Sequence, residues 1–83
     1  MRRAGPLVYV TAAAREEAER LLPGRVPENV VEEAIMAARV TGSSAGFVWS
    51  DSWRAHYVRE PGHLRRRPRA WRVRKFEERG GRT

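Results

Sequence analysis

The second half of the chain alternates large apolar residues with basic ones, and this period of two limits what the chain can fold into. In residues 53–59, Trp53 and Tyr57 stand at odd positions, whereas Arg54 and His56 stand at even positions. Successive side chains of a β-strand point to opposite faces, so the pattern predicts a strand with one apolar and one basic face. The strands predicted in this half of the chain are 46–50, 53–59 and 70–76, with a tight turn at 50–52.

Counting positions extends this prediction to the two faces of the sheet. The apolar residues at odd positions are expected in the core, and they are Phe47, Trp49, Trp53, Ala55, Tyr57, Trp71 and Val73. The residues at even positions are expected on the opposite face, and they are Arg54, His56, Val58, Arg72 and Arg74. Whether the odd positions of different strands lie on the same face of the sheet depends on the lengths of the turns between those strands. Phe76 interrupts the alternation, which predicts a bulge, a bend or the end of the strand.

The first half of the chain is predicted to contain one strand and two helices. Residues 7–10 are β-branched and aromatic, which indicates a strand buried on both faces, with Tyr9 in the core. Residues 12–22 are rich in helix formers and end at Pro23-Gly24. A second, amphipathic helix is expected to begin at Pro27 and to end at Gly42.

These elements predict a single small α+β domain over residues 1–83. The expected order is a strand, two helices and then a three-stranded antiparallel meander, forming one sheet with the helices packed on one face. Residues 1–5 and 79–83 are expected to be frayed ends. A domain of 83 residues buries only a little over ~60% of the surface of its unfolded chain. A homodimer would add buried area.

Positive charge is concentrated in the second half of the chain. The formal net charge is +7; residues 1–50 contain six Arg and six Glu, whereas residues 51–83 contain eleven basic residues and four acidic ones. Such clustering on a small domain is typical of nucleic-acid binding, with RNA expected in preference to DNA. Two alternatives remain open, namely a solvated basic tail and a surface for an acidic protein partner.

The residues expected to hold phosphate lie on the basic strands and in the loop 63–69. A guanidinium is a planar fork that matches phosphate oxygens, and such contacts position a nucleic acid without reading its sequence. The predicted nucleic-acid-binding residues are Arg54, Arg65, Arg66, Arg67, Arg69, Arg72, Arg74 and Lys75. The three Trp and two Tyr residues are assigned to the core in preference to base stacking.

Few residues offer other chemistry. The chain has no cysteine, and its histidines, His56 and His63, lack the neighbours that a metal site requires, so no metal and no cofactor are expected. Residues 42–46 match the G-x-S-x-G nucleophile motif. That motif needs a strand before it and a helix after it, whereas here the order is reversed, so a loop is expected.

Hydropathy indicates the compartment. No run approaches the ~18 apolar residues of a membrane span, and the basic start at Arg2 and Arg3 precedes only a short apolar stretch. We read no signal peptide. A cytoplasmic protein without a membrane partner is therefore expected.

The order of the predicted elements resembles that of the RelE/ParE-type toxin superfamily, whose members are compact and basic. Residues 11–40 are also similar to a small uncharacterised family of that layout, in which a strand ends in Thr and a helix carries spaced arginines. The residues that fall near its positions are Thr11, Arg20, Arg25, Val26, Val30 and Ile35. The resemblance implies a second function, an endoribonuclease that cuts mRNA and has an acidic antitoxin as partner.

If the chain is such a ribonuclease, the catalytic residues would be His56, Arg72 and Arg74, with Arg54 and Lys75 also available. The related family has a His-Ala pair at the start of its first helix, where this sequence has alanines at 12–14. A role for that histidine therefore does not carry over. No tyrosine follows Tyr57, so the late tyrosine of some RelE-type enzymes is absent as well.

Overall fold

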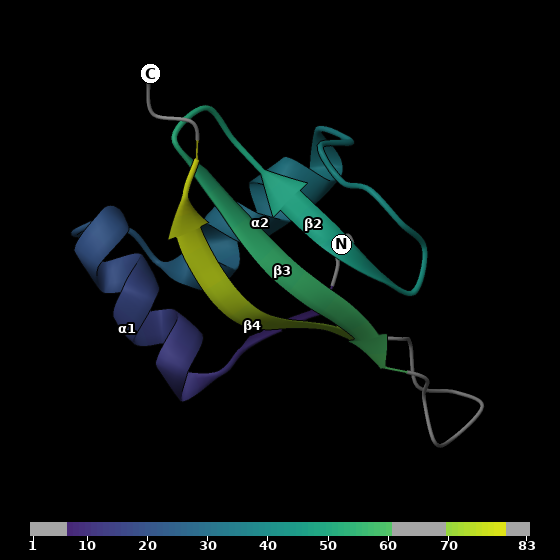
Figure 1. Ribbon diagram of the computed structural model, residues 1–83, viewed down its shortest axis with the longest axis horizontal. Helices are drawn as coiled ribbons and strands as arrows, with labels where there is room; N and C mark the ends of the chain where they lie inside the picture. Colours follow the sequence, from purple (N-terminus) through teal and green to yellow (C-terminus); the bar gives the residue numbers. More distant parts are fainter. Residues whose placement is uncertain (1–6, 61–69, 80–83) are drawn as a thin grey trace, which may run out of the picture.

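The alternation and the helical spacing produce a two-layer arrangement of one sheet and two helices (Figure 1). The computed structural model describes residues 7–60 and 70–79, and of Glu60 only the backbone. In chain order the elements are β1 (Leu7–Val10), α1 (Ala12–Leu21), α2 (Pro27–Met36), β2 (Ala45–Trp49), β3 (Trp53–Glu60) and β4 (Ala70–Glu78). The predicted α+β class is confirmed, and so is the meander of three antiparallel strands, β2 to β4.

The sheet is mixed, with the strand order β1-β4-β3-β2. β1 lies beside β4 in parallel, and Tyr9 is paired with Arg72. β1 ends at Val10, so the rest of β4 has no strand on that side, and α1 lies along it. There the backbone N–H of Phe76 donates to the Glu17 carboxylate of α1 at 2.8 Å, which satisfies a donor of the open edge.

Helix α1 packs its alanine face against the sheet. The Thr11 hydroxyl caps the helix by accepting from the N–H of Ala14 at 3.2 Å. Ala14 and Ala18 are buried, and their small side chains let the helix approach the strands closely. An ion pair between Arg15 and Glu28 joins this helix to the first turn of α2 and lowers the pKa of Glu28 through the hydrogen bond from Arg15.

Helix α2 begins at Pro27 as predicted but ends at Met36, well before Gly42. Ala38 has φ of 62°, a left-handed conformation. The N–H of Ala38 donates to the carbonyl of Ile35, and that of Arg39 to the carbonyl of Ala34, each at 2.9 Å. These bonds are those of a Schellman motif, which satisfies the last helical carbonyls and stops the helix without a glycine.

The core lies between the helices and one face of the sheet. Of the three outcomes expected at Phe76, which were a bulge, a bend or the end of the strand, the structure shows a bulge. Tyr57 is paired with Val73, whereas His56 is paired with Lys75, so Arg74 is the extra residue. The shift returns Phe76 to the core side. The buried hydrophobic residues of this cluster are Ala14, Ala18, Val30, Val31, Ala34, Val48, Trp53, Ala55, Tyr57, Val73 and Phe76, with Trp71 partly buried against them.

Two predictions about the strands are wrong. In β2 it is Val48 that is buried, whereas Phe47 is paired with His56 and therefore shares its face. β1 is an edge strand rather than one buried on both faces, because Leu7 is 37% exposed and Tyr9 48% exposed. In both strands the pairing register decides on which face of the sheet a side chain lies. An odd-numbered residue of β1 or β2 is paired with an even-numbered residue of the neighbouring strand, as Tyr9 is with Arg72 and Phe47 with His56.

Candidate nucleic-acid interface

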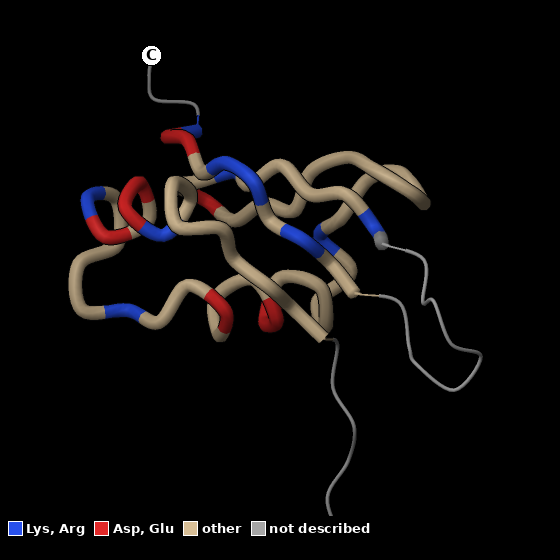
Figure 2. The backbone as a smooth tube through the Cα atoms, turned by 90° about the horizontal axis from the view of Figure 1, so that it is seen from below, with Lys and Arg blue, Asp and Glu red and all other residues tan. Residues whose placement is uncertain are grey.

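The side of the sheet away from the helices carries a mixture of cationic and aromatic side chains. We call it the open face, and its members follow from the register of the strands. They are Tyr9 of β1, Ala45 and Phe47 of β2, Arg54, His56 and Val58 of β3, and Arg72, Arg74, Lys75 and Glu77 of β4. Trp49, which was predicted to lie in the core, is only half-buried; it is paired with Arg54 but lines a hollow with Val30 and Trp53, so it is not counted with the open face. Figure 2 shows basic segments along the strands and a red segment at the end of β4, while the helices carry both acidic and basic segments.

The bulge in β4 doubles the cationic charge at the centre of the open face. Val73 and Phe76 are both buried in the core, and the two residues between them, Arg74 and Lys75, are both exposed. In a regular strand one of these two side chains would point into the core. Within the described part of the chain, neither side chain forms a hydrogen bond or an ion pair. Both are therefore available to an anion.

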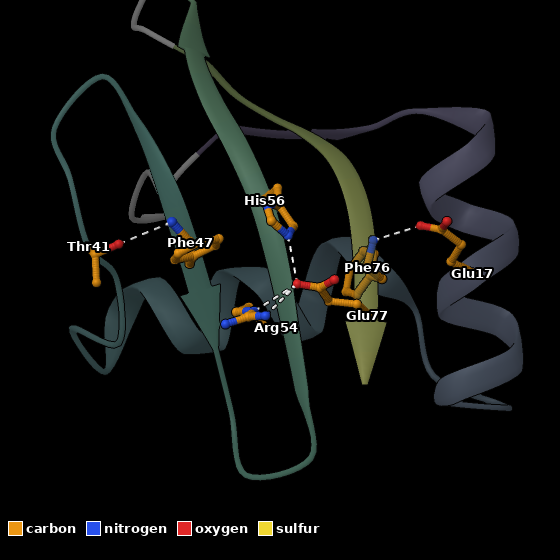
Figure 3. Close-up of polar contacts among 7 residues, drawn as sticks. All are labelled: Glu17, Thr41, Phe47, Arg54, His56, Phe76 and Glu77. Carbon is orange, nitrogen blue, oxygen red and sulfur yellow. Dashed lines mark hydrogen bonds and ion pairs between the residues drawn. The ribbon is translucent and has the colours of Figure 1, made fainter. Parts of the chain in front are cut away.

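Glu77 organises the adjacent part of the open face (Figure 3). One of its carboxylate oxygens accepts a hydrogen bond from Arg54 Nε at 2.9 Å and forms an ion pair with Arg54 Nη2 at 2.7 Å. The same oxygen lies 2.8 Å from His56 Nε2. The hydrogen bonds from His56 and then Arg54 lower the pKa of Glu77, so it stays ionised and holds both neighbours in fixed positions. We call these three residues the Glu77 cluster.

Phe47 lies against the Glu77 cluster from the neighbouring strand. Its ring centroid is 4.7 Å from that of His56, with the ring planes at 81°, and the guanidinium carbon of Arg54 is 4.8 Å from the Phe47 centroid. The backbone N–H of Phe47 donates to the Thr41 hydroxyl at 3.2 Å. Phe47 is thus fixed by an edge-to-face contact, a cation–π contact and its own backbone.

A shallow hollow of about 490 Å³ lies beside Phe47 on the open face. It is lined by Ala45, Gly46, Phe47, His56, Tyr57, Val58, Arg74 and Lys75. Most of its surface is apolar, and the two adjacent cations of the bulge stand at its rim. The arrangement can accommodate a flat apolar group that is attached to an anion.

The structure brings the strand residues of the predicted site together. Arg54, His56, Arg72, Arg74 and Lys75 all belong to the open face. His63, Arg65, Arg66, Arg67 and Arg69 lie outside the described residues. The loop predicted for residues 42–46 is present only at residues 42–44, which form no helix or strand, whereas Ala45 and Gly46 belong to β2.

Two members of the site were missed by reasoning from the sequence. Phe47 was assigned to the core. Residues 45–49 are apolar at both odd and even positions, so the local sequence does not indicate on which face of the sheet Phe47 lies. Glu77 follows Phe76, where the predicted strand ended, whereas β4 continues to Glu78. Extending the strand past the bulge would have placed Glu77 beside Arg54.

Among residues 7–60 and 70–79, no group of three His, Asp or Glu side chains is placed to hold a metal ion. In the same residues, no helix is long and apolar enough to cross a membrane. Comparisons with protein-family models, with curated proteins and with solved structures found no match to this chain.

Proposed function

We propose that this protein is a small nucleic-acid-binding module that holds RNA against the open face. The observation that carries the proposal is the pair of exposed cations, Arg74 and Lys75, that the bulge places together beside an aromatic ring. With Arg54 and Arg72 they give this face four cations against one carboxylate among the described side chains. Cations interleaved with aromatic rings suit single-stranded nucleic acid.

The proposal assigns a role to each part of the basic half of the chain. Arg72, Arg74 and Lys75 would neutralise successive phosphates, and Arg65, Arg66, Arg67 and Arg69 would extend the contact beyond the sheet. The acidic residues of the helices would stay away from the polyanion on the other side of the molecule. We also propose a cytoplasmic location, since RNA is abundant there.

Binding is tested by fluorescence anisotropy with a labelled single-stranded RNA at several salt concentrations. Neutralising Z phosphates on a single strand gives a slope of log K against log salt of about −0.7Z, so the seven cations assigned to phosphate predict about −5. The double variant Arg74→Ala, Lys75→Ala should make the slope shallower by about 1.4. The matched control, Arg20→Ala with Arg25→Ala, removes the same charge from the helical part of the chain and should leave the slope unchanged.

An absence of RNA binding at low salt would overturn the proposal and favour an acidic protein partner for the open face. Retention of the full slope in the double variant would also overturn it, because the bulge would then not contact phosphate. Double-stranded DNA of the same length serves as the comparison for the expected preference for RNA.

A second candidate function, endoribonuclease activity, is favoured by the Glu77 cluster. Glu77 engages Nε2 of His56, which leaves Nδ1 without a hydrogen bond in the described residues. Nδ1 could then take the proton of a ribose 2′-hydroxyl, whose oxygen forms a bond to the adjacent phosphorus while the bond to the 5′-oxygen breaks. The 5′-oxygen takes a proton from water, and Arg74 would stabilise the charged transition state.

A denaturing gel of the same binding samples separates the two functions. Intact RNA in the presence of saturating protein indicates a binding module. Fragments ending in a 2′,3′-cyclic phosphate indicate the ribonuclease, and His56→Ala should then abolish cleavage while the salt dependence of binding, which reports the phosphate contacts, is retained. Cleavage that survives His56→Ala would refute this assignment of the base.

A further inference from the structure

We infer that the hollow beside Phe47 is a subsite for one unpaired nucleobase, so that the protein selects single-stranded RNA over duplex RNA. The inference rests on the proposed function and deepens it, because phosphate contacts alone do not distinguish exposed bases from paired ones. It concerns the apolar part of the open face, whereas the proposed function rests on its cations.

The composition of the hollow matches the two parts of a nucleotide. Phe47 and Val58 provide apolar surface and His56 a second flat ring, and the volume of about 490 Å³ lies in the range of ligand pockets, about 300–1,000 Å³. Arg74 and Lys75 line the same hollow, so a base inside it would place its own phosphate beside two cations. This charge complementarity favours a nucleotide over an uncharged apolar ligand or an aromatic side chain of a peptide.

The wall of the hollow is held rigidly, as a preformed site requires. The Tyr57 hydroxyl donates to the carbonyl of Thr41 at 2.7 Å and lies 3.1 Å from that of Gly42. A Cβ added at Gly46 would lie 2.2 Å from the Thr41 carbonyl oxygen, so the segment before β2 contacts the strand directly. Because these contacts hold the segment before Phe47 against the sheet, little order has to be gained when a base enters.

A base can enter the hollow only when its flat faces and edges are free of the neighbouring bases of a helix. In a duplex each base is stacked and paired, and reaching it would require unstacking. Stacking of a base on an aromatic side chain strengthens binding by about 5- to 150-fold. We therefore expect the protein to discriminate between RNA with exposed bases and RNA without them.

The test uses three labelled probes of equal length with the full chain: single-stranded oligouridine, the same ribose-phosphate backbone without bases, and a uridine–adenosine duplex. The unmodified protein should bind oligouridine at least 5-fold more tightly than the abasic strand or the duplex. Phe47→Leu, which keeps an apolar side chain but removes the ring, should lose this preference while its affinity for the abasic strand is unchanged. Tyr9→Leu is the matched control, since it removes an exposed ring of the same face outside the hollow.

Ala45→Leu keeps the test decisive if Phe47→Leu fails to fold. Ala45 is exposed at the rim, so a larger side chain there should fill the hollow without entering the core, and the preference should again be lost. Equal binding of oligouridine and the abasic strand overturns the inference and leaves the proposed function intact. Equal losses in Phe47→Leu and Tyr9→Leu also overturn it, whereas binding of none of the probes refutes the proposed function.

Discussion

Replacing Ala38 by glycine should stabilise the protein, although it adds no contact. Ala38 has φ of 62° at the end of α2 and is exposed, so its Cβ is strained by the left-handed backbone and contributes no core packing. That conformation costs an L-residue about 1–2 kcal/mol, which glycine does not pay. The greater freedom of glycine in the unfolded chain offsets about 0.4–1 kcal/mol of this gain. We expect the free energy of unfolding to rise by about 0.5–1 kcal/mol.

For a domain of this size, the change corresponds to an increase in Tm of about 2–8 °C. Thermal denaturation followed by circular dichroism measures it, and urea denaturation gives the free energy. Ala37→Gly is the matched control: the neighbouring residue has φ of −87°, so glycine there relieves no strain and should lower the stability. The reasoning is refuted if Ala38→Gly leaves Tm unchanged or lowers it, or if both variants shift Tm in the same direction.

Three further outcomes follow from the site. Tyr57→Phe removes the hydrogen bond to the Thr41 carbonyl and should lower the free energy of unfolding by about 1 kcal/mol in urea denaturation; an unchanged free energy of unfolding would contradict this. Gly46→Ala should cost about 1–3 kcal/mol, because its Cβ would overlap the Thr41 carbonyl oxygen; an unchanged Tm would contradict this contact. The hydrogen bond from His56 lowers the pKa of Glu77. The stability that ionised Glu77 contributes to the folded protein is therefore fully present above the ordinary carboxyl pKa and is lost as the pH falls through the lowered pKa. The stability difference between the unmodified protein and Glu77→Gln should therefore be largest near pH 7 and shrink in acid, and a difference independent of pH would refute it.

The elements themselves could be predicted from the sequence because their signals are local. Thr11 and Pro27 mark the starts of the helices, and the alternation in residues 53–59 assigns each of its side chains to the correct face of β3. The irregularity at Phe76 was also a local signal. Val73 and Phe76 are both apolar, but one is at an odd and the other at an even position of the same strand, so a regular strand could not bury both, and the structure has a bulge between them. The end of α2 was missed because an alanine, rather than a glycine, adopts the left-handed conformation there.

The sequence by itself therefore determined which segments form strands and helices, and that the basic residues are concentrated in the last two strands and in residues 61–69. Only the tertiary structure decided how the strands align. Alternation fixes the relative directions of side chains within one strand, but a shift of one residue between strands reverses the face that a whole strand presents. That register put Phe47 beside His56, and the bulge turned both Arg74 and Lys75 outward. The candidate site is a product of pairing between residues far apart in the chain, which local patterns do not specify.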